Sequence, residues 1–315
     1  MTDTGPLFVS SGDLIADRRY KWAIEQAGRG DFVAAADILA QTVELAPAFA
    51  TAWFALGAIR DRLGDRDGAI VAFAKAKDTD PNDYHGARLQ LARLGAGVAT
   101  PAMSEAYVRR LFDQYAGRYD TALTERLAYR GPALLRKAVE AVTRKAGLPL
   151  HFANMLDLGC GTGLAGAAFR PWADRLTGVD LSPAMIARAE SKGLYDRLAT
   201  ADIGDFLNGE AGSGGAYDLV LAADVLVYVN DLAPIATAIA RLLKLGGIFA
   251  FTVETHAGEG VKLLPTLRYA YAEDYIRRTL AAAGLQTTSV SSAAVRHEKG
   301  APVAGLVVVA RSLPR

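Results

Sequence analysis

Residues 155–163 read MLDLGCGTG, and this stretch decides the fold. Apolar residues of a strand lead into a glycine-rich turn, and a helical pattern begins directly after Gly163. Glycine adopts backbone angles that other residues avoid, and it lets a ligand approach the main chain closely. The stretch therefore predicts a strand–loop–helix unit with a ligand lying against the loop.

Two acids beside this loop discriminate between possible ligands. Asp180 ends the next apolar run, where a carboxylate can accept hydrogen bonds from both hydroxyls of a ribose. The spacing Gly161-x-Gly163-x-x-Gly166 also fits a dinucleotide fingerprint, which is a weak signal in a glycine-rich chain. However, Asp157 would repel a pyrophosphate at the start of the helix. S-adenosylmethionine carries a sulfonium and an ammonium instead, so the sequence favours it over a dinucleotide.

From residue 152 onward, short apolar runs alternate with helical patterns. This alternation predicts a parallel sheet with helices on both faces. The runs 287–296 and 304–310, joined by a tight turn, suit an antiparallel hairpin at the end of the sheet. The expected strands before it are 152–158, 176–180, 198–201, 217–221 and 248–253, and the clearest expected helices are 183–192, 232–245 and 272–283.

Residues 104–311 resemble the class I S-adenosylmethionine-dependent methyltransferases. The resemblance rests on five segments in the family's order: 155–163, 178–185, 201–203, 217–226 and 242–247. It implies an α/β fold with a Rossmann-like seven-stranded sheet, mostly parallel, with an antiparallel C-terminal strand. It also implies S-adenosyl-L-methionine as cofactor and methyl transfer as the reaction.

The resemblance assigns a part of the cofactor to each segment. Asp157 and the glycine loop would hold the methionine end, Asp180 the ribose, and Asp202 with Ile203 the adenine. The segment 112–120 resembles the N-terminal lid of small-molecule members, in which a tyrosine, here Tyr119, contacts the methionine end. We expect Cys160 to pack against the cofactor without reacting, since no base neighbours it in the sequence. The full expected set is Tyr119, Asp157, Gly159, Cys160, Gly161, Thr162, Gly163, Asp180, Leu181, Met185, Asp202, Ile203 and Ala222.

The residues that would bind the methyl acceptor have weaker signals in the sequence. His256 follows the fifth expected strand and is the best candidate for a general base, although it also suits an exposed loop. Arginine forks favour carboxylate or other anionic groups. We therefore expect a pocket for an anionic acceptor, with core or surface placement as the alternative, formed by Tyr228, Arg268, Tyr269, Tyr271 and Arg296.

The N-terminal part contains an internal repeat, because residues 16–49 align with 50–83 at an offset of 34. The pattern resembles tetratricopeptide repeats, in which small residues let two helices approach and large residues such as Trp22 fill the groove between them. We expect an all-α repeat domain at 1–97 with a capping helix at 84–95, and a methyltransferase domain at 98–315 with lid helices within 104–146. Two repeats are fewer than the three or so that such arrays usually need, which predicts support from the rest of the chain or from a second copy.

Composition limits the remaining possibilities. The chain has 315 residues, a net charge of +1 and one cysteine, so no internal disulfide can form. Its four histidines are scattered, so no metal site is expected, and the near-zero charge disfavours nucleic acid and membrane surfaces. We expect a cytoplasmic enzyme that methylates an O or N atom of a small molecule. A protein methyltransferase that recruits its substrate through the repeats, and a non-catalytic cofactor-binding adaptor, remain alternatives.

Overall fold

The computed structural model describes residues 8–117, 129–212, 217–298 and 300–312. The chain divides into two compact units. Unit 1 comprises Met1–Arg110 and Leu263–Leu267, and unit 2 comprises Leu111–Lys262 and Arg268–Arg315.

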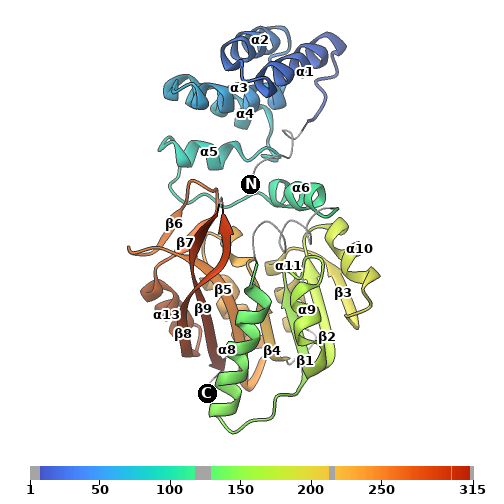
Figure 1. The fold of residues 1–315 in the computed structure, drawn as a ribbon, viewed down its shortest axis with the longest axis vertical. Coiled ribbons are helices and arrows are strands. Elements are labelled where there is room, and N and C mark those ends of the chain that lie inside the picture. Colours follow the sequence, from blue (N-terminus) through green and yellow to red (C-terminus); the bar gives the residue numbers. More distant parts are fainter. Residues whose placement is uncertain (1–7, 118–128, 213–216, 299, 313–315) are drawn as a thin grey trace. The chain divides into compact units, whose positions relative to one another are not determined.

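Helices follow one another through most of unit 1 (Figure 1). Aspartates stabilise three of their starts as N-caps: Asp13 accepts from the amide of Ile15 at 2.7 Å, and Asp31 and Asp65 act in the same way. The helices are α1 (Leu14–Gly28), α2 (Phe32–Leu45), α3 (Ala50–Arg62), α4 (Arg66–Thr79) and α5 (Ala87–Arg93).

Small residues allow close packing between these helices, as the repeat pattern predicts. A Cβ added to Gly57 in α3 would lie 2.7 Å from the Phe73 ring in α4, so only glycine fits there. In the first helix pair, α1 and α2, the large residue that packs inward is not the expected Trp22. Trp22 is 54% exposed, whereas Tyr20 is 3% exposed and packs against Phe49. The expectation that Trp22 fills the groove is therefore wrong, because α1 turns its Tyr20 face inward.

Unit 2 is built around a nine-stranded sheet among the described residues. The strand order is β3-β2-β1-β4-β5-β7-β6, and β9 lies antiparallel against β5 and β8. The pairings of β1 with β2 and β4, of β2 with β3, of β4 with β5 and of β5 with β7 are parallel. The strands are β1 (Phe152–Leu158), β2 (Ala173–Asp180), β3 (Arg197–Thr200), β4 (Tyr217–Ala222), β5 (Leu243–Thr255), β6 (Val261–Leu263), β7 (Tyr269–Tyr271), β8 (Leu285–Glu298) and β9 (Ala301–Ser312).

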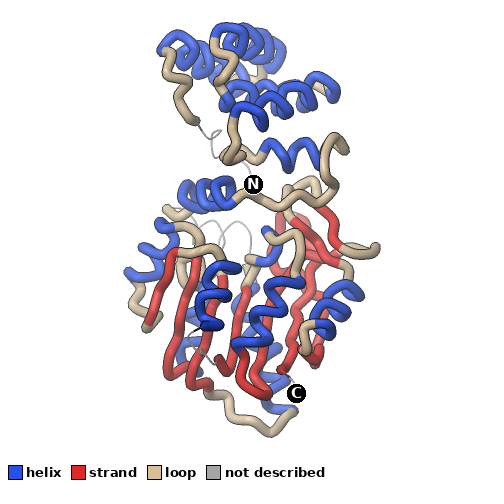
Figure 2. Tube along the Cα trace, turned by 180° about the vertical axis from the view of Figure 1, so that it is seen from behind, coloured by secondary structure: helices blue, strands red, loops and turns tan. Residues whose placement is uncertain are grey.

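Helices cover both faces of this sheet, as Figure 2 shows. Strands buried on both faces carry near-continuous apolar runs, and the end of β1 is buried throughout from Met155 to Leu158. The helices are α6 (Glu105–Tyr115, of which the part from Leu111 belongs to unit 2), α8 (Gly131–Lys145), α9 (Leu164–Phe169), α10 (Pro183–Ser191), α11 (Ile203–Gly212), α12 (Ala233–Leu242) and α13 (Glu273–Ala282), with short 3₁₀ turns η2 (Arg170–Trp172) and η3 (Leu226–Tyr228).

The Rossmann-like, mostly parallel sheet with an antiparallel strand agrees with the expected fold class. The strand count differs, because β6 and β7 are three-residue strands too short to give a periodic signal. The expected helix 232–245 ends at Leu242, since Leu243 already has extended backbone and begins β5. Within the residues described here, no helix has the length and apolar character needed to cross a membrane.

Candidate functional site

The glycine loop follows the carboxyl end of β1. Gly159, Gly161 and Gly163 all have positive φ, at 64°, 53° and 91°. A Cβ on Gly159 would lie 2.2 Å from a methyl carbon of Val225, in the loop after β4. A side chain is therefore excluded at this point both by backbone conformation and by space.

A hollow opens beside the loop. It encloses about 270 Å³, part of which is open to solvent. Sequence reasoning identified four of its lining residues, namely Gly159, Cys160, Gly161 and Thr162. It missed the others, Tyr129, Leu164, Ala165 and Ala223, because an apolar residue in a helix or loop carries no signal for lining a site.

Asp180 joins the end of β2 to the glycine loop. Its Oδ2 accepts from the Gly161 amide at 2.9 Å, and its Oδ1 accepts from the Ser182 amide at 2.9 Å. The carboxylate is 9% exposed, and burial raises its pKa. This carboxylate is thus hydrogen-bonded to Gly161, which lines the hollow.

The start of α10 is held next to this carboxylate. Ser182 caps the helix by accepting from the Met185 amide at 3.1 Å. The Ser182 hydroxyl donates to Asp113 of α6 at 2.5 Å, which connects the lid-like segment to α10. Met185 is fully buried and Leu181 is half-buried.

Asp157 lies at the end of β1 and is 1% exposed. Its Oδ2 accepts from the Tyr195 hydroxyl at 2.7 Å, while its Oδ1 has no hydrogen-bond partner in the described protein. Burial raises the pKa of this carboxyl group to about 7. The neighbouring Cys160 thiol has its pKa raised well above its usual value, also by burial, which fits an unreactive side chain.

The residues expected at the adenine begin α11. Asp202 accepts from the amides of Gly204 at 2.7 Å and Asp205 at 3.2 Å, so it caps this helix. Ile203 is half-buried beside it. Gly163 ends the glycine loop and Ala222 ends β4, but neither is among the residues that line the hollow. Tyr119 lies outside the described residues.

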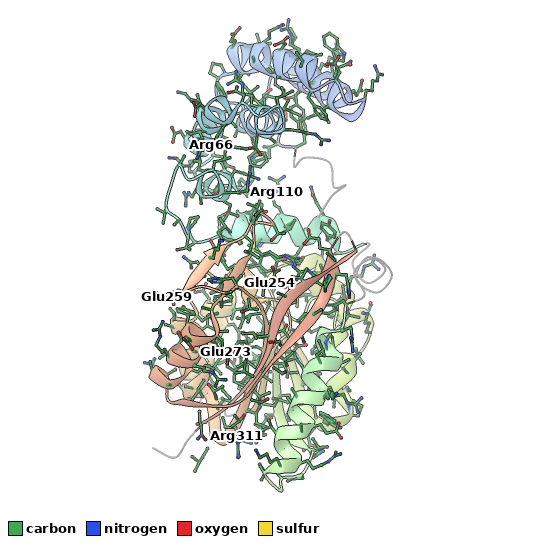
Figure 3. All side chains as sticks on the ribbon, turned by 60° about the vertical axis from the view of Figure 1, so that its left-hand side comes forward. Arg66, Arg110, Glu254, Glu259, Glu273 and Arg311 are labelled. Atoms are coloured by element: carbon green, nitrogen blue, oxygen red, sulfur yellow. The ribbon has the colours of Figure 1, made fainter. Side chains whose placement is uncertain are left out.

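A buried charge cluster occupies the carboxyl ends of β4 and β5. Arg296 donates to both oxygens of Asp224, at 2.8 and 3.0 Å, and to Glu254, which Figure 3 labels. Arg268 lies 3.5 Å from Glu254 and 3.9 Å from Asp224. The cluster contains two guanidinium groups and two carboxylates, so its formal charge is balanced.

The pocket for an anionic acceptor stays a prediction, and the structure shows that both of its arginines lie against carboxylates. Arg296 is 2% exposed and Arg268 is engaged by the same carboxylates, so neither guanidinium offers uncompensated positive charge. The Tyr271 hydroxyl donates to backbone carbonyls of Leu226 and Val229, and Tyr269 is fully buried. Tyr228 lies under the Arg268 guanidinium, 5.5 Å from it, and burial raises its pKa. Sequence reasoning missed Asp224 and Glu254, whose only signal was their position at strand ends.

His256 follows β5 and is half-buried. Its Nε2 lies 3.3 Å from the carbonyl oxygen of Gly260, within the same loop. Among the described residues, no hydrogen bond joins His256 to the glycine loop, so its role as a base stays a prediction. No group of three or more potential metal ligands occurs within the described part of the chain.

Comparison with known proteins identifies part of this architecture. A family model described as "Methyltransferase domain" matches residues 156–251, which include the glycine loop, Asp180 and Asp202. The chain carries a methyltransferase domain. The prediction of an S-adenosylmethionine-dependent methyltransferase is confirmed for this domain.

The chain is also similar to the human "Methyltransferase-like protein 27", with 38% identity over 105 residues. The match covers 33% of this chain and 40% of that protein, so it spans less than half of the curated relative.

Solved structures share the fold. The 4+2 cyclase SpnF matches with a TM-score of 0.52 and 18% identity over 68% of this chain and 99% of that one. The N-methyltransferase NodS from Bradyrhizobium japonicum, in complex with S-adenosyl-L-homocysteine, matches with a TM-score of 0.49 and 21% identity over 65% and 97%. At these identities the similarity concerns the fold alone.

The described residues fit a cationic cofactor. Two buried carboxylates, Asp157 and Asp180, lie beside the glycine loop, and neither forms an ion pair within the described chain. One of them keeps a buried oxygen without a protein partner. A ligand with positive charge would compensate them, whereas a pyrophosphate would not.

Proposed function

We propose that the protein transfers a methyl group from S-adenosylmethionine to an O or N atom of a small-molecule acceptor. The observation that carries this proposal is the pairing of Asp180 with the Gly161 amide at 2.9 Å, beside a hollow lined by the glycine loop. It holds a ribose-binding carboxylate against a loop that a ligand can approach.

The parts of the cofactor would be divided among the loops at this edge. Asp157 and the loop 159–163 would receive the methionine end, Asp180 the ribose, and Asp202 with Ile203 the adenine, while Leu181, Met185 and Ala222 provide apolar backing. The bound cofactor supplies a methyl group on a positively charged sulfur. The protein's own contribution is to hold an acceptor atom in line with that methyl group and to keep the groups oriented.

The balanced cluster of Asp224, Glu254, Arg268 and Arg296 shapes the proposed acceptor class. Because its charges compensate one another, it offers no strong attraction to an anion. We therefore propose an uncharged or weakly polar acceptor that packs beside half-buried Tyr228. His256 stays an untested candidate for the base, and because its hydrogen bond to Gly260 lies within its own loop we expect it to contribute little to the rate.

The direct test is turnover. Purified protein would be incubated with S-adenosylmethionine and a panel of small metabolites and peptides, and formation of S-adenosylhomocysteine would be measured. Turnover with small hydroxyl or amine compounds alone supports the proposal. Cofactor binding without turnover on any member would favour the adaptor, and the match to a cyclase is a reminder that this fold is not restricted to one reaction.

We propose that residues 1–97 form a domain of two tetratricopeptide repeats with a cap, and that residues 98–315 form the enzyme domain. The helix pairs α1–α2 and α3–α4 support this division, as does the close approach at Gly57. The buried single cysteine fits the reducing cytoplasm that we propose as the location.

One observation favours a peptide substrate as the second candidate. Leu14, Ile15 and Trp22 are 76%, 61% and 54% exposed on one face of α1. Arg18 and Lys21 are exposed on the same face, so it would suit a peptide with apolar and acidic side chains. The variant Trp22→Arg should abolish turnover of such a peptide and spare small substrates. Equal turnover of both substrates would remove this candidate.

A further inference from the structure

Tyr195 fills a niche beneath the glycine loop. It lies between α10 and β3, and its hydroxyl donates to Oδ2 of Asp157 at 2.7 Å. A Cβ on Gly166 would lie 2.3 Å from the Tyr195 hydroxyl oxygen, and a Cβ on Gly178 would lie 2.8 Å from its ring. These two glycines make room for a tyrosine. Gly166, which completes the dinucleotide fingerprint, is therefore explained without a dinucleotide.

We propose that Tyr195 is a positioning residue for the cofactor, because it orients the Asp157 carboxylate and keeps it ionised for the cationic methionine end. This inference rests on the proposed function. Tyr195 acts through Asp157 and need not touch the cofactor itself.

The hydrogen bond from Tyr195 affects the protonation of Asp157, because no positive charge lies near this carboxyl group in the described part of the chain. The titratable groups that face it are Tyr195, Asp180 and Cys160, and none of them brings positive charge. Burial raises the Asp157 pKa to about 7, and the bond from Tyr195 opposes that rise. Near neutral pH, loss of the hydroxyl would therefore protonate a larger share of the carboxyl groups and weaken their attraction for a cation.

The chain offers a matched control. The Tyr217 hydroxyl donates to Glu210 at 2.7 Å, the same distance, and Tyr217 is 6% exposed at the start of β4. Tyr195→Phe and Tyr217→Phe thus remove the same group from the same kind of bond, and both keep the ring that fills the space.

The experiment measures S-adenosylhomocysteine affinity by calorimetry between about pH 5.5 and 8.5, a range chosen around the approximate Asp157 pKa. For the unmodified protein, affinity should fall as pH drops through about 7. Tyr195→Phe should move that midpoint upward by about one pH unit and weaken binding about fivefold at pH 7. Tyr217→Phe should leave both quantities unchanged.

The outcomes separate the two hypotheses. If the unmodified protein binds no S-adenosylhomocysteine at any pH, the proposed function fails. If it binds and Tyr195→Phe keeps the same affinity and midpoint, only the inference about Tyr195 is overturned. Asp157→Asn adds a second criterion. The double variant with Asp157→Asn and Tyr195→Phe should bind S-adenosylhomocysteine no more weakly than Asp157→Asn alone. Additive losses would show that Tyr195 does not act through Asp157.

Discussion

Two regions of unit 2 bury carboxylates near the same edge of the sheet, and they treat the charge in different ways. At the ends of β4 and β5, Asp224 and Glu254 both contact arginines. At the ends of β1 and β2, Asp157 and Asp180 receive only neutral donors within the described chain, which are backbone amides and the Tyr195 hydroxyl.

This difference in charge compensation distinguishes a cluster that stabilises the fold from a pair of carboxylates suited to bind a ligand. A buried ion pair is satisfied within the protein, and removal of one partner leaves an unpaired charge. A buried carboxylate without a cation costs folding free energy, which the raised pKa values of Asp157 and Asp180 express. We infer that the second region is maintained for a ligand that brings positive charge, and the predictions below test this contrast.

The largest effect on folding is expected for Arg296→Met. It leaves Asp224 and Glu254 without their closest cation, so the free energy of unfolding should fall by about 3–5 kcal/mol. Chemical denaturation measures this change. As control, Arg277→Met removes an exposed pair with Glu273 and should cost less than about 1 kcal/mol. Equal costs for both variants would remove the distinction between the buried cluster and a surface pair.

Next comes Asp180→Ala, which should weaken S-adenosylhomocysteine binding by about 100-fold or more. The substitution removes the acceptor for two amides and for the proposed ribose contact, and bonds to a charged group contribute about 1.5–3 kcal/mol each. Calorimetry measures the affinity. Asp218→Ala is the control, because Asp218 also accepts from a backbone amide, that of Asn154, but at the start of β4. Unchanged affinity in Asp180→Ala would count against the whole site.

Asp157→Asn should weaken binding by about tenfold at pH 8 and at the same time stabilise the ligand-free protein. The folded-state pKa of about 7 lies above the ordinary value of 3.8, so the folded protein holds this proton more tightly. The associated stability is present below about pH 4 and is lost as pH rises through 7. The variant's melting temperature should therefore exceed that of the unmodified protein at pH 8, but not at pH 4. A lower melting temperature at pH 8 would show that Asp157 is not destabilising when ionised.

The smallest effect is expected for His256→Ala, with a decrease in kcat of less than about threefold. A positioned general base typically contributes 10²–10⁴-fold to the rate, but the hydrogen bond of His256 stays within its own loop. Steady-state kinetics on any acceptor found in the panel provides the measurement. A decrease of 100-fold with unchanged cofactor affinity would instead establish His256 as a strong candidate for the base.

Much of the fold could be predicted because its signals are local. The apolar run 152–158 coincides with β1, and the helix pattern 183–192 exceeds α10 by one residue. Strand ends were harder to place, since β5 extends from Leu243 to Thr255 beyond the expected 248–253. Of the extra residues, Leu243, Glu254 and Thr255 pair with neighbouring strands, and that pairing depends on the whole sheet.

In the candidate site too, the sequence identified residues with a local signal, whereas contacts between distant residues came only from the structure. Asp157, Asp180 and the glycine loop were identified from spacing, because strand ends of a parallel sheet meet at one edge. The pairing of Arg296 with Asp224 joins residues 72 positions apart, and that of Tyr195 with Asp157 joins residues 38 apart. Neither contact could be predicted from a periodic pattern in the sequence.

The sequence by itself determined the alternation of strands and helices and the chemistry of the glycine loop, because backbone conformation and apolar periodicity act over a few neighbouring residues. Only the tertiary structure decided which buried charges are compensated. Charge compensation depends on which side chains far apart in the sequence come into contact. The sequence suggested that Arg268 and Arg296 line an anion pocket, and the structure pairs them with carboxylates in a balanced cluster. It also left Asp157 with a tyrosine as its side-chain partner, where the sequence showed only an acid beside a loop.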